Sequence, residues 1–419
     1  MARDANDILR ENGEANLRER IDGTRQTGGR GRETILGEWD AGDDTNPVPP
    51  RQWLLGNVFC RRFVSSLIAD GGTGKTALRV AQALALATGR NLTGEYVFQR
   101  CRVLLVSLED DKDELRRRVK AAMLHHDVSE AEVKGWLFLA APGGKAGKLM
   151  TPGDKGRVTT AGLAAALKQT VQRRKVDFVC LDPFVKTHGL SENDNSLMDQ
   201  VIEFLANLAI EMNIALDVPH HTAKGSANPG NADRGRGASA IKDGARLVYT
   251  LTTMSDDEAA TFGVPPADRR LYVRVDAGKV NIAPPAAAAK WFRLVNVALG
   301  NGNDLYPGGD NVQTVEPWAA PGTWEGLTDE LVNRILTDID AGTGDGELYS
   351  AASSATSRAA WKVVQKHAAK KTEKQCRDMV ATWVKSGLLF KETYRSPGTR
   401  KDQEGLHVDD MKRPGKVGT

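Results

Sequence analysis

Short hydrophobic runs alternate with segments of helical periodicity through most of the chain after Trp53. The hydrophobic runs predict strands at Val103–Leu108, Trp136–Ala140, Phe178–Leu181, Ile214–Val218, Ala245–Thr252 and Leu271–Val275. The periodic segments predict helices at Asp111–Leu124, Leu163–Arg174 and Leu197–Met212. Buried strands that alternate with helices are typical of an α/β fold with a mostly parallel sheet covered by helices on both faces.

The chain ends differ from this pattern. Residues 1–45 are polar and end at the proline-rich segment Asn46–Pro50, so we expect a mostly disordered arm with at most one short helix near Asp7–Arg20. The α/β domain is expected over 46–300, with a flexible Gly/Lys loop at 142–157. The segment 284–321 is rich in Ala, Gly, Pro and Asn and is interpreted as the exit of this domain, with a linker at 301–322.

A second, smaller domain is expected at 323–408. Its predicted elements are three helices and two strands: Leu327–Ile339, Ser357–His367, Glu373–Ser386, 387–390 and 405–408. Three helices followed by a hairpin suggest a winged helix, which is a helix-turn-helix variant. From Arg358 to Lys416 there are 15 Lys and Arg against 7 Asp and Glu, including a basic tail at 409–419. Such an excess indicates either contact with nucleic acid or a solvated surface.

Composition restricts the class of protein further. The 419 residues are 40% hydrophobic and 26% charged, which is ordinary for a soluble protein. No run approaches the length of a membrane span and the first residues are polar, so we expect no membrane partner and no signal peptide. The four scattered cysteines, without a C-x-x-C pair, favour a reduced cytoplasmic protein without a structural zinc.

The strongest motif is Leu-Ile-Ala-Asp-Gly-Gly-Thr-Gly-Lys-Thr-Ala at 67–77, between a predicted strand and a helix. Glycines let the backbone N–H groups surround an anion, a lysine binds the β- and γ-phosphates, and a threonine hydroxyl binds Mg²⁺. Ala69 replaces the usual first glycine. The motif predicts an ATP or GTP site. Its expected contacts are Asp70, Gly71, Gly72, Thr73, Gly74, Lys75, Thr76 and Ala77.

Two carboxylates end predicted strands downstream of this loop. Asp182 ends Phe-Val-Cys-Leu-Asp, and the carboxyl ends of parallel strands face the ligand crevice, so Asp182 is expected beside Thr76 at Mg²⁺. Glu109 ends Val-Ser-Leu-Glu and is the candidate that orients and deprotonates the attacking water. Its neighbours Asp110 and Asp111 suit the alternative role of capping the next helix.

A third segment, Asp217-Val-Pro-His-His-Thr-Ala-Lys224, ends a strand in two histidines. His220 or His221 is a candidate sensor of the γ-phosphate, and zinc is not expected because further ligands at the right spacing are missing. The glycine-rich stretch that follows carries Lys224, Arg234 and Arg236. It is interpreted as a mobile loop that contacts nucleic-acid backbone, with a solvated surface loop as the alternative.

The ordered set of motifs from about Leu54 to Leu294 resembles the plasmid RepA-type hexameric replicative helicases of the RecA/DnaB superfamily. Besides the motifs above, the resemblance rests on Arg236-Gly-Ala-Ser, Lys242-Asp-Gly-Ala-Arg246, Gly278-Lys-Val-Asn-Ile-Ala-Pro and Trp291-Phe-Arg. It implies a RecA-like ATPase domain with ATP and Mg²⁺ bound between subunits. Arg246 matches the family's arginine finger, which acts on a neighbouring subunit's ATP, and Lys279 matches a second trans-acting cation.

The resemblance also implies partners: further copies in a ring, with a homo-hexamer expected, single-stranded DNA, and a replication initiator or primase. The setting would be replication of a plasmid, phage or other mobile element. Two other functions fit the sequence. One is a non-helicase RecA- or KaiC-like ATPase that acts as a recombination mediator or regulatory switch. The other is a replication initiator in which the C-terminal domain reads duplex DNA and ATP controls assembly.

Overall fold

The computed structural model describes residues 37–153, 158–222, 229–231, 241–242, 244–283 and 289–415. The chain divides into two compact units, Met1–Pro50 and Arg51–Thr419. In the first unit, residues 37–50 are exposed and contain neither helix nor strand. The rest of the expected N-terminal arm, including the proposed helix near Asp7–Arg20, lies outside the described residues. None of the described helices has the length and apolar character needed to cross a membrane.

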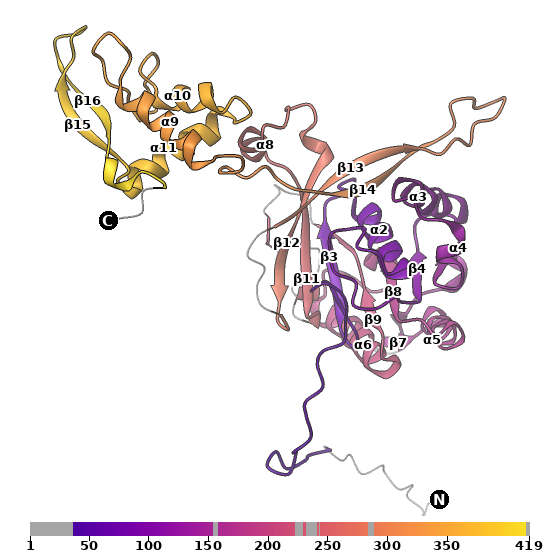
Figure 1. The fold of residues 1–419 in the computed structure, drawn as a ribbon. Helices are drawn as coiled ribbons and strands as arrows, with labels where there is room; N and C mark the ends of the chain where they lie inside the picture. The colour runs from indigo at the N-terminus through magenta and orange to yellow at the C-terminus, as the bar shows by residue number, and fades with distance from the viewer. Residues whose placement is uncertain are drawn as a thin grey trace, which may run out of the picture. The chain divides into compact units, whose positions relative to one another are not determined.

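A large sheet is the centre of the second unit, with ten strands in its described part (Figure 1). Its order is β14-β13-β12-β11-β3-β9-β8-β4-β5, and β10 also pairs with β3. The strands are β3 Val64–Ala69, β4 Val103–Ser107, β5 Leu137–Ala140, β8 Phe178–Asp182, β9 Ala215–Asp217, β10 His220–His221, β11 Leu247–Thr253, β12 Tyr272–Val280, β13 Lys290–Ala298 and β14 Asn311–Trp318. Pairing is parallel from β5 to β11 and antiparallel from β11 to β14.

Helices cover both faces of the parallel part. On one face lie α2 (Lys75–Thr88) and α3 (Lys112–His125), in one core with alternate strand residues such as Leu67 and Leu105. On the other lie α5 (Gly162–Arg174) and α6 (Asn195–Met212), in a second core with the intervening residues such as Ile68 and Leu104. Because successive side chains of a strand point to opposite faces, these strands are apolar throughout. The predicted α/β sheet with helices on both faces is confirmed.

The segment 284–321 differs from its interpretation as a domain exit. Its described residues contain β13 and β14, which pair antiparallel over their length, and β14 therefore occupies part of the expected linker 301–322. The hairpin also packs on α3, because His126 Nε2 lies 2.9 Å from the Val315 carbonyl oxygen and His125 Nε2 lies 3.1 Å from Glu316 Oε2. The β-branched and aromatic residues at 291–297 and 312–318 were the available signal, and the high Ala and Gly content around them obscured the pattern.

The expected loop 142–157 also contains regular structure. A 3-10 turn spans Gly143–Ala146, and β6 (Met150–Pro152) pairs antiparallel with β7 (Val158–Thr160). Two further short strands, β1 (Trp53–Leu55) and β2 (Phe59–Cys60), pair ahead of β3. Two further helices in the described residues are α4 (Glu130–Val133) and α8 (Asp256–Phe262).

The C-terminal residues form a separate core. Helices α9 (Asp329–Asp340), α10 (Ala360–His367) and α11 (Glu373–Ser386) pack with the hairpin of β15 (Leu389–Arg395) and β16 (Asp402–Val408). The three helices lie within three residues of their predicted bounds, whereas both strands of the hairpin are longer than predicted and leave a shorter loop between them. Their shared core includes Ile335, Val364, Met379 and Leu406, each fully or almost fully buried.

Candidate nucleotide site

The phosphate loop lies where the sequence predicts, between the end of β3 and the start of α2. Gly72 and Gly74 have φ angles of 76° and 95°, in the left-handed region that favours glycine. A Cβ atom at Gly74 would also lie only 2.6 Å from Leu294 Cδ2 of β13. The backbone conformation therefore favours glycine here, and any larger residue would also have to displace the end of the Leu294 side chain. The cradle is open for an anion at the N-terminus of α2, where the helix dipole favours negative charge.

Lys75 is buried at the first position of α2 and carries the charge of the site. Its Nζ lies 3.1 Å from Nδ1 of His221. Three nearby acids, Asp182, Glu109 and Asp70, interact electrostatically with its charge. Burial lowers the pKa of Lys75, whereas these three acids oppose the shift. Burial and the Lys75 charge both lower the pKa of His221, so its imidazole is neutral near pH 7. An ammonium can only donate, and Nδ1 of His221 therefore accepts.

Thr76 and Asp182 meet as predicted. The Thr76 hydroxyl donates a hydrogen bond of 2.7 Å to Oδ2 of Asp182, and burial raises the pKa of the Asp182 carboxyl. A cavity of about 20 Å³ adjoins both residues. A hydroxyl beside a carboxylate is the oxygen donor set that Mg²⁺ takes together with phosphate oxygens and water. These residues fit the ion, and a bound cation would favour the ionised carboxylate.

The three consecutive acids after β4 have different surroundings. Asp111 caps α3, because its Oδ1 accepts from the Glu114 N–H at 2.8 Å, and Asp110 lies 3.0 Å from Nε of Arg118. Glu109 is exposed, and within the described part of the chain its carboxylate has neither a hydrogen-bond nor an ion-pair partner. Glu109 lies close enough to Lys75 for its negative charge to raise the pKa of that lysine. Of the three acids, Glu109 is thus the one whose carboxylate is exposed near Lys75.

The two histidines face different surroundings. His220 is buried, with its ring 5.5 Å from that of Phe184 and its Nδ1 3.8 Å from Oε1 of Glu192. His221 faces Lys75 instead. Of the two γ-phosphate sensors that the sequence left open, His221 is therefore the one at the phosphate side.

Thr222 also contacts the loop, although the sequence gave it no role. Its N–H donates to the Ala69 carbonyl at 3.1 Å and its hydroxyl donates to Oδ1 of Asp70. Thr73 donates to the backbone oxygen of Asp70 at 2.9 Å, and Ala77 is buried in the first turn of α2. Gly71 is exposed. The strand that carries His221 is thus tied directly to the residue that opens the loop.

A buried ion pair connects α2 to strand β9 of the sheet. Arg79 donates from Nε and Nη2 to the two carboxylate oxygens of Asp217, each at 2.8 Å, and both side chains are almost fully buried. The Ser65 hydroxyl donates to Oδ1 of Asp217 at 2.7 Å. Burial raises the pKa of Asp217, and the Arg79 charge and this hydrogen bond oppose it. A carboxylate inside the hydrophobic run Ile214–Val218 was the signal that sequence reasoning missed.

Arg246 and Lys279 lie together at the other end of the sheet. The Arg246 N–H donates to the Val64 carbonyl, where β3 begins, and Lys279 pairs with Val248. The phosphate loop follows Ala69, where β3 ends, so about 17 Å of strand separates Arg246 from it at ~3.3 Å per residue. Arg246 is exposed and remote from its own chain's phosphate loop. Lys224, Arg234 and Arg236 lie outside the described residues.

Residues 31–227 match a protein-family model, AAA_25, described as an AAA domain. The matched range contains the phosphate loop, Glu109, Asp182 and both histidines, and it ends before β11. Together with the phosphate loop at the carboxyl end of an inner strand of a mostly parallel sheet, the match supports the broad class of RecA- and DnaB-like P-loop ATPases. Nucleotide binding and ATP hydrolysis follow from this class.

Proposed function

We propose that the protein is a ring-forming ATPase that hydrolyses ATP at subunit interfaces and moves on single-stranded DNA, as a helicase or translocase of plasmid, phage or mobile-element replication. One observation carries the interface part of the proposal. Among the described residues, the side chains whose charges shift the pKa of Lys75 are acids and not arginines, while Arg246 lies at the far end of β3. Phosphoryl transfer needs cationic stabilisation of the transferring group, so a neighbouring subunit is the natural source.

Each side chain then has a defined task. The loop N–H groups and Lys75 hold the phosphates, and Glu109 orients a water and accepts its proton. His221, neutral and next to Lys75, responds to the γ-phosphate by losing or keeping its hydrogen bond with the lysine. Thr76 and Asp182 would hold Mg²⁺, which supplies positive charge at the phosphate oxygens. Arg246, with Lys279 beside it, stabilises the transition-state charge in the next subunit.

The DNA part of the proposal is supported by the C-terminal domain and the resemblance to replicative helicases. Three helices and a hairpin match the order of elements in a winged helix. The hairpin carries four exposed cations, Lys391, Arg395, Arg400 and Lys401. Its turn end is held by Glu347, whose carboxylate accepts from Tyr394 and Ser396 and from the Gly398 N–H at 3.0 Å. A fixed hairpin with exposed cations is suited to phosphate contacts.

The deciding experiment is unwinding of a forked duplex with ATP and Mg²⁺, with the Lys75→Ala chain as the inactive control. Strand displacement by wild-type protein, absent in the control, supports a helicase. ATP hydrolysis stimulated by single-stranded DNA without strand displacement points to a translocase or a recombination mediator instead. Binding confined to one duplex sequence in a footprint favours the replication initiator, which the same C-terminal elements would also suit.

A further inference from the structure

The loop at the tip of the β13–β14 hairpin is held in shape by its own hydrogen bonds. Nδ2 of Asn301 donates to Oδ2 of Asp310 at 2.7 Å, and the Asp310 N–H donates back to the Asn301 amide oxygen at 2.8 Å. Oδ1 of Asn303 accepts from the N–H groups of Leu305 and Tyr306. These hydrogen bonds hold the tip in one turn conformation.

This ordered tip exposes two adjacent large hydrophobic side chains. Leu305 is 76% exposed and Tyr306 is 67% exposed. Single exposed hydrophobic residues are common on soluble proteins, but an aliphatic and an aromatic residue side by side on a protruding rigid loop are costly to leave in water. Residues of this kind act as anchors when they enter a pocket on a partner, because little conformational entropy is lost.

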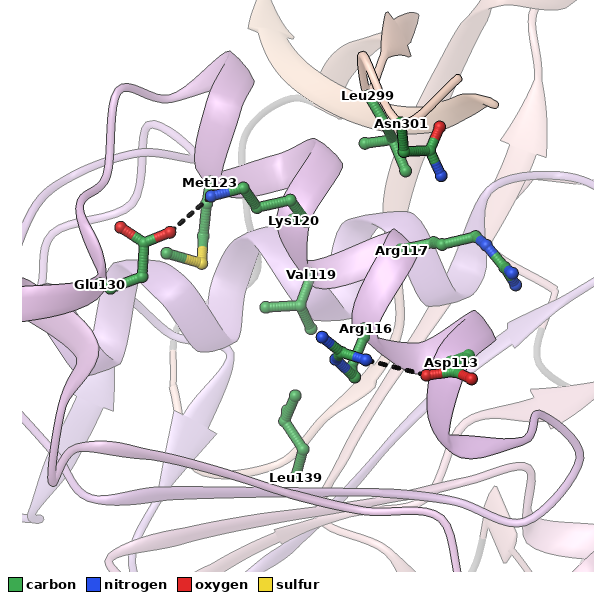
Figure 2. Close-up of a pocket in the computed structure, with 10 residues that line it drawn as sticks. All are labelled: Asp113, Arg116, Arg117, Val119, Lys120, Met123, Glu130, Leu139, Leu299 and Asn301. Carbon is green, nitrogen blue, oxygen red and sulfur yellow. Dashed lines mark hydrogen bonds and ion pairs between the residues drawn. The ribbon is translucent and has the colours of Figure 1, made fainter. Parts of the chain in front are cut away.

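A groove of about 670 Å³ lies on the outer face of α3, away from the phosphate loop. Figure 2 shows Val119 and Met123 of α3 in this groove, with Leu139 of β5 across from them. Leu299 and Asn301, at the base of the tip loop, line its upper edge. The floor is therefore apolar.

The groove has a charged rim. Arg116, Arg117 and Lys120 outnumber Asp113 and Glu130. The ion pair between Arg116 and Asp113 is 66% and 65% exposed, so water screens it and the guanidinium is available to another acid. Asp304, directly before Leu305 in the tip, is such an acid.

We propose that the tip of one copy inserts Leu305 and Tyr306 into the groove of a second copy, with Asp304 against Arg116. The tip cannot fill its own groove, because the base of the same loop already lines it while Leu305 stays exposed. Tip and groove are different patches, so the contact is head-to-tail, and repetition of such a contact closes a ring when the rotation permits. The inference rests on the ring part of the proposed function and assigns one of its contacts.

Crosslinking in trans tests the contact. All four native cysteines, Cys60, Cys101, Cys180 and Cys376, are buried, so introduced cysteines will react selectively. A Tyr306→Cys chain and a Leu139→Cys chain, mixed with a short bismaleimide, should give a crosslinked dimer that neither chain gives alone. The matched control is a Tyr96→Cys chain, whose aromatic side chain is also exposed, mixed with Leu139→Cys. Crosslinking as strong with Tyr96→Cys as with Tyr306→Cys would overturn the assignment.

A substitution provides an independent measurement. The double change Leu305→Ser and Tyr306→Ser should raise the concentration needed for assembly by at least about tenfold, the usual effect of losing an interface anchor. Sedimentation measures assembly, and Tyr96→Ser is the control. A ring that forms at the wild-type concentration in the double variant overturns this contact and leaves the ring proposal standing. A wild-type chain that stays monomeric with ATP and DNA overturns the ring and this contact together.

Discussion

Arg79 of α2 and Asp217 of β9 form a bidentate ion pair. Both nitrogen–oxygen distances are 2.8 Å, and both side chains are buried between helix and sheet. The pair ties the helix that carries Lys75 and Thr76 to the strand that leads to His221. The position of the phosphate-binding residues relative to one another therefore depends on a contact that takes no part in the chemistry.

Loss of one partner of this pair should be strongly destabilising. Asp217→Ala leaves the Arg79 charge buried without its carboxylate, and we expect a loss of about 3–5 kcal/mol in the free energy of unfolding. The combined change Arg79→Met and Asp217→Leu should recover most of it, because no charge is then buried. Urea denaturation measures both. Removal of the exposed Lys168–Glu211 pair, at about 1 kcal/mol or less, is the control.

Glu109→Gln should keep ATP binding and lose hydrolysis by about 10²–10⁴-fold, since a neutral amide cannot accept the proton of the attacking water. Asp110→Asn should remain close to the wild-type rate, because Asp110 is engaged with Arg118. Turnover of labelled ATP, with binding followed separately, distinguishes the two. A fast Glu109→Gln enzyme together with a slow Asp110→Asn enzyme would reverse the assignment.

Arg246→Ala should spare ATP binding and reduce hydrolysis by about 10³-fold or more, if the residue acts as a finger in the next subunit. An assay that mixes two inactive variants tests this directly. Arg246→Ala chains keep an intact phosphate site, and Lys75→Ala chains keep an intact arginine. Mixed rings contain interfaces where both are present, so activity should return. A mixture that assembles and remains inactive would mean that Arg246 has another role.

Acid should destabilise the ATPase domain partly through His188. This residue is 3% exposed, packs against Phe184, and burial lowers its pKa to about 4. Below the unfolded pKa of about 6.5 the unfolded chain binds a proton that the folded chain excludes, so stability falls as the pH falls towards 4. Between pH 7 and pH 5 this amounts to about 2 kcal/mol.

The variant His188→Asn tests this origin. Its amide oxygen can still accept from the Leu190 N–H, as Nδ1 does, and it does not titrate. The loss of unfolding free energy between pH 7 and pH 5, measured by urea denaturation, should be smaller in the variant by about the 2 kcal/mol assigned to His188. An unchanged pH dependence would assign the acid sensitivity to other groups.

Local patterns in the sequence determined the phosphate loop, the strand and helix on either side of it, and the strand-end position of Asp182. The reason is that glycine conformations, helix starts and runs of buried residues depend on neighbours along the chain. The same holds for the three helices of the C-terminal domain, whose bounds follow apolar periodicity, whereas the sequence indicated the hairpin but not the full length of its strands.

Contacts between distant segments decided the rest. The sequence offered His220 and His221 equally, and only the packing of His220 against Phe184 left His221 beside Lys75. The sequence already favoured Glu109 among the three acids through its place at the strand end, and the structure adds the contacts of Asp110 with Arg118 and of Asp111 with the start of α3. The sequence of β13 and β14 suggested a domain exit, because the place of these strands in the fold depends on their antiparallel pairing and on their packing against α3. Burial and pairing across long sequence distances carry no local signature, so the tertiary structure alone specifies them.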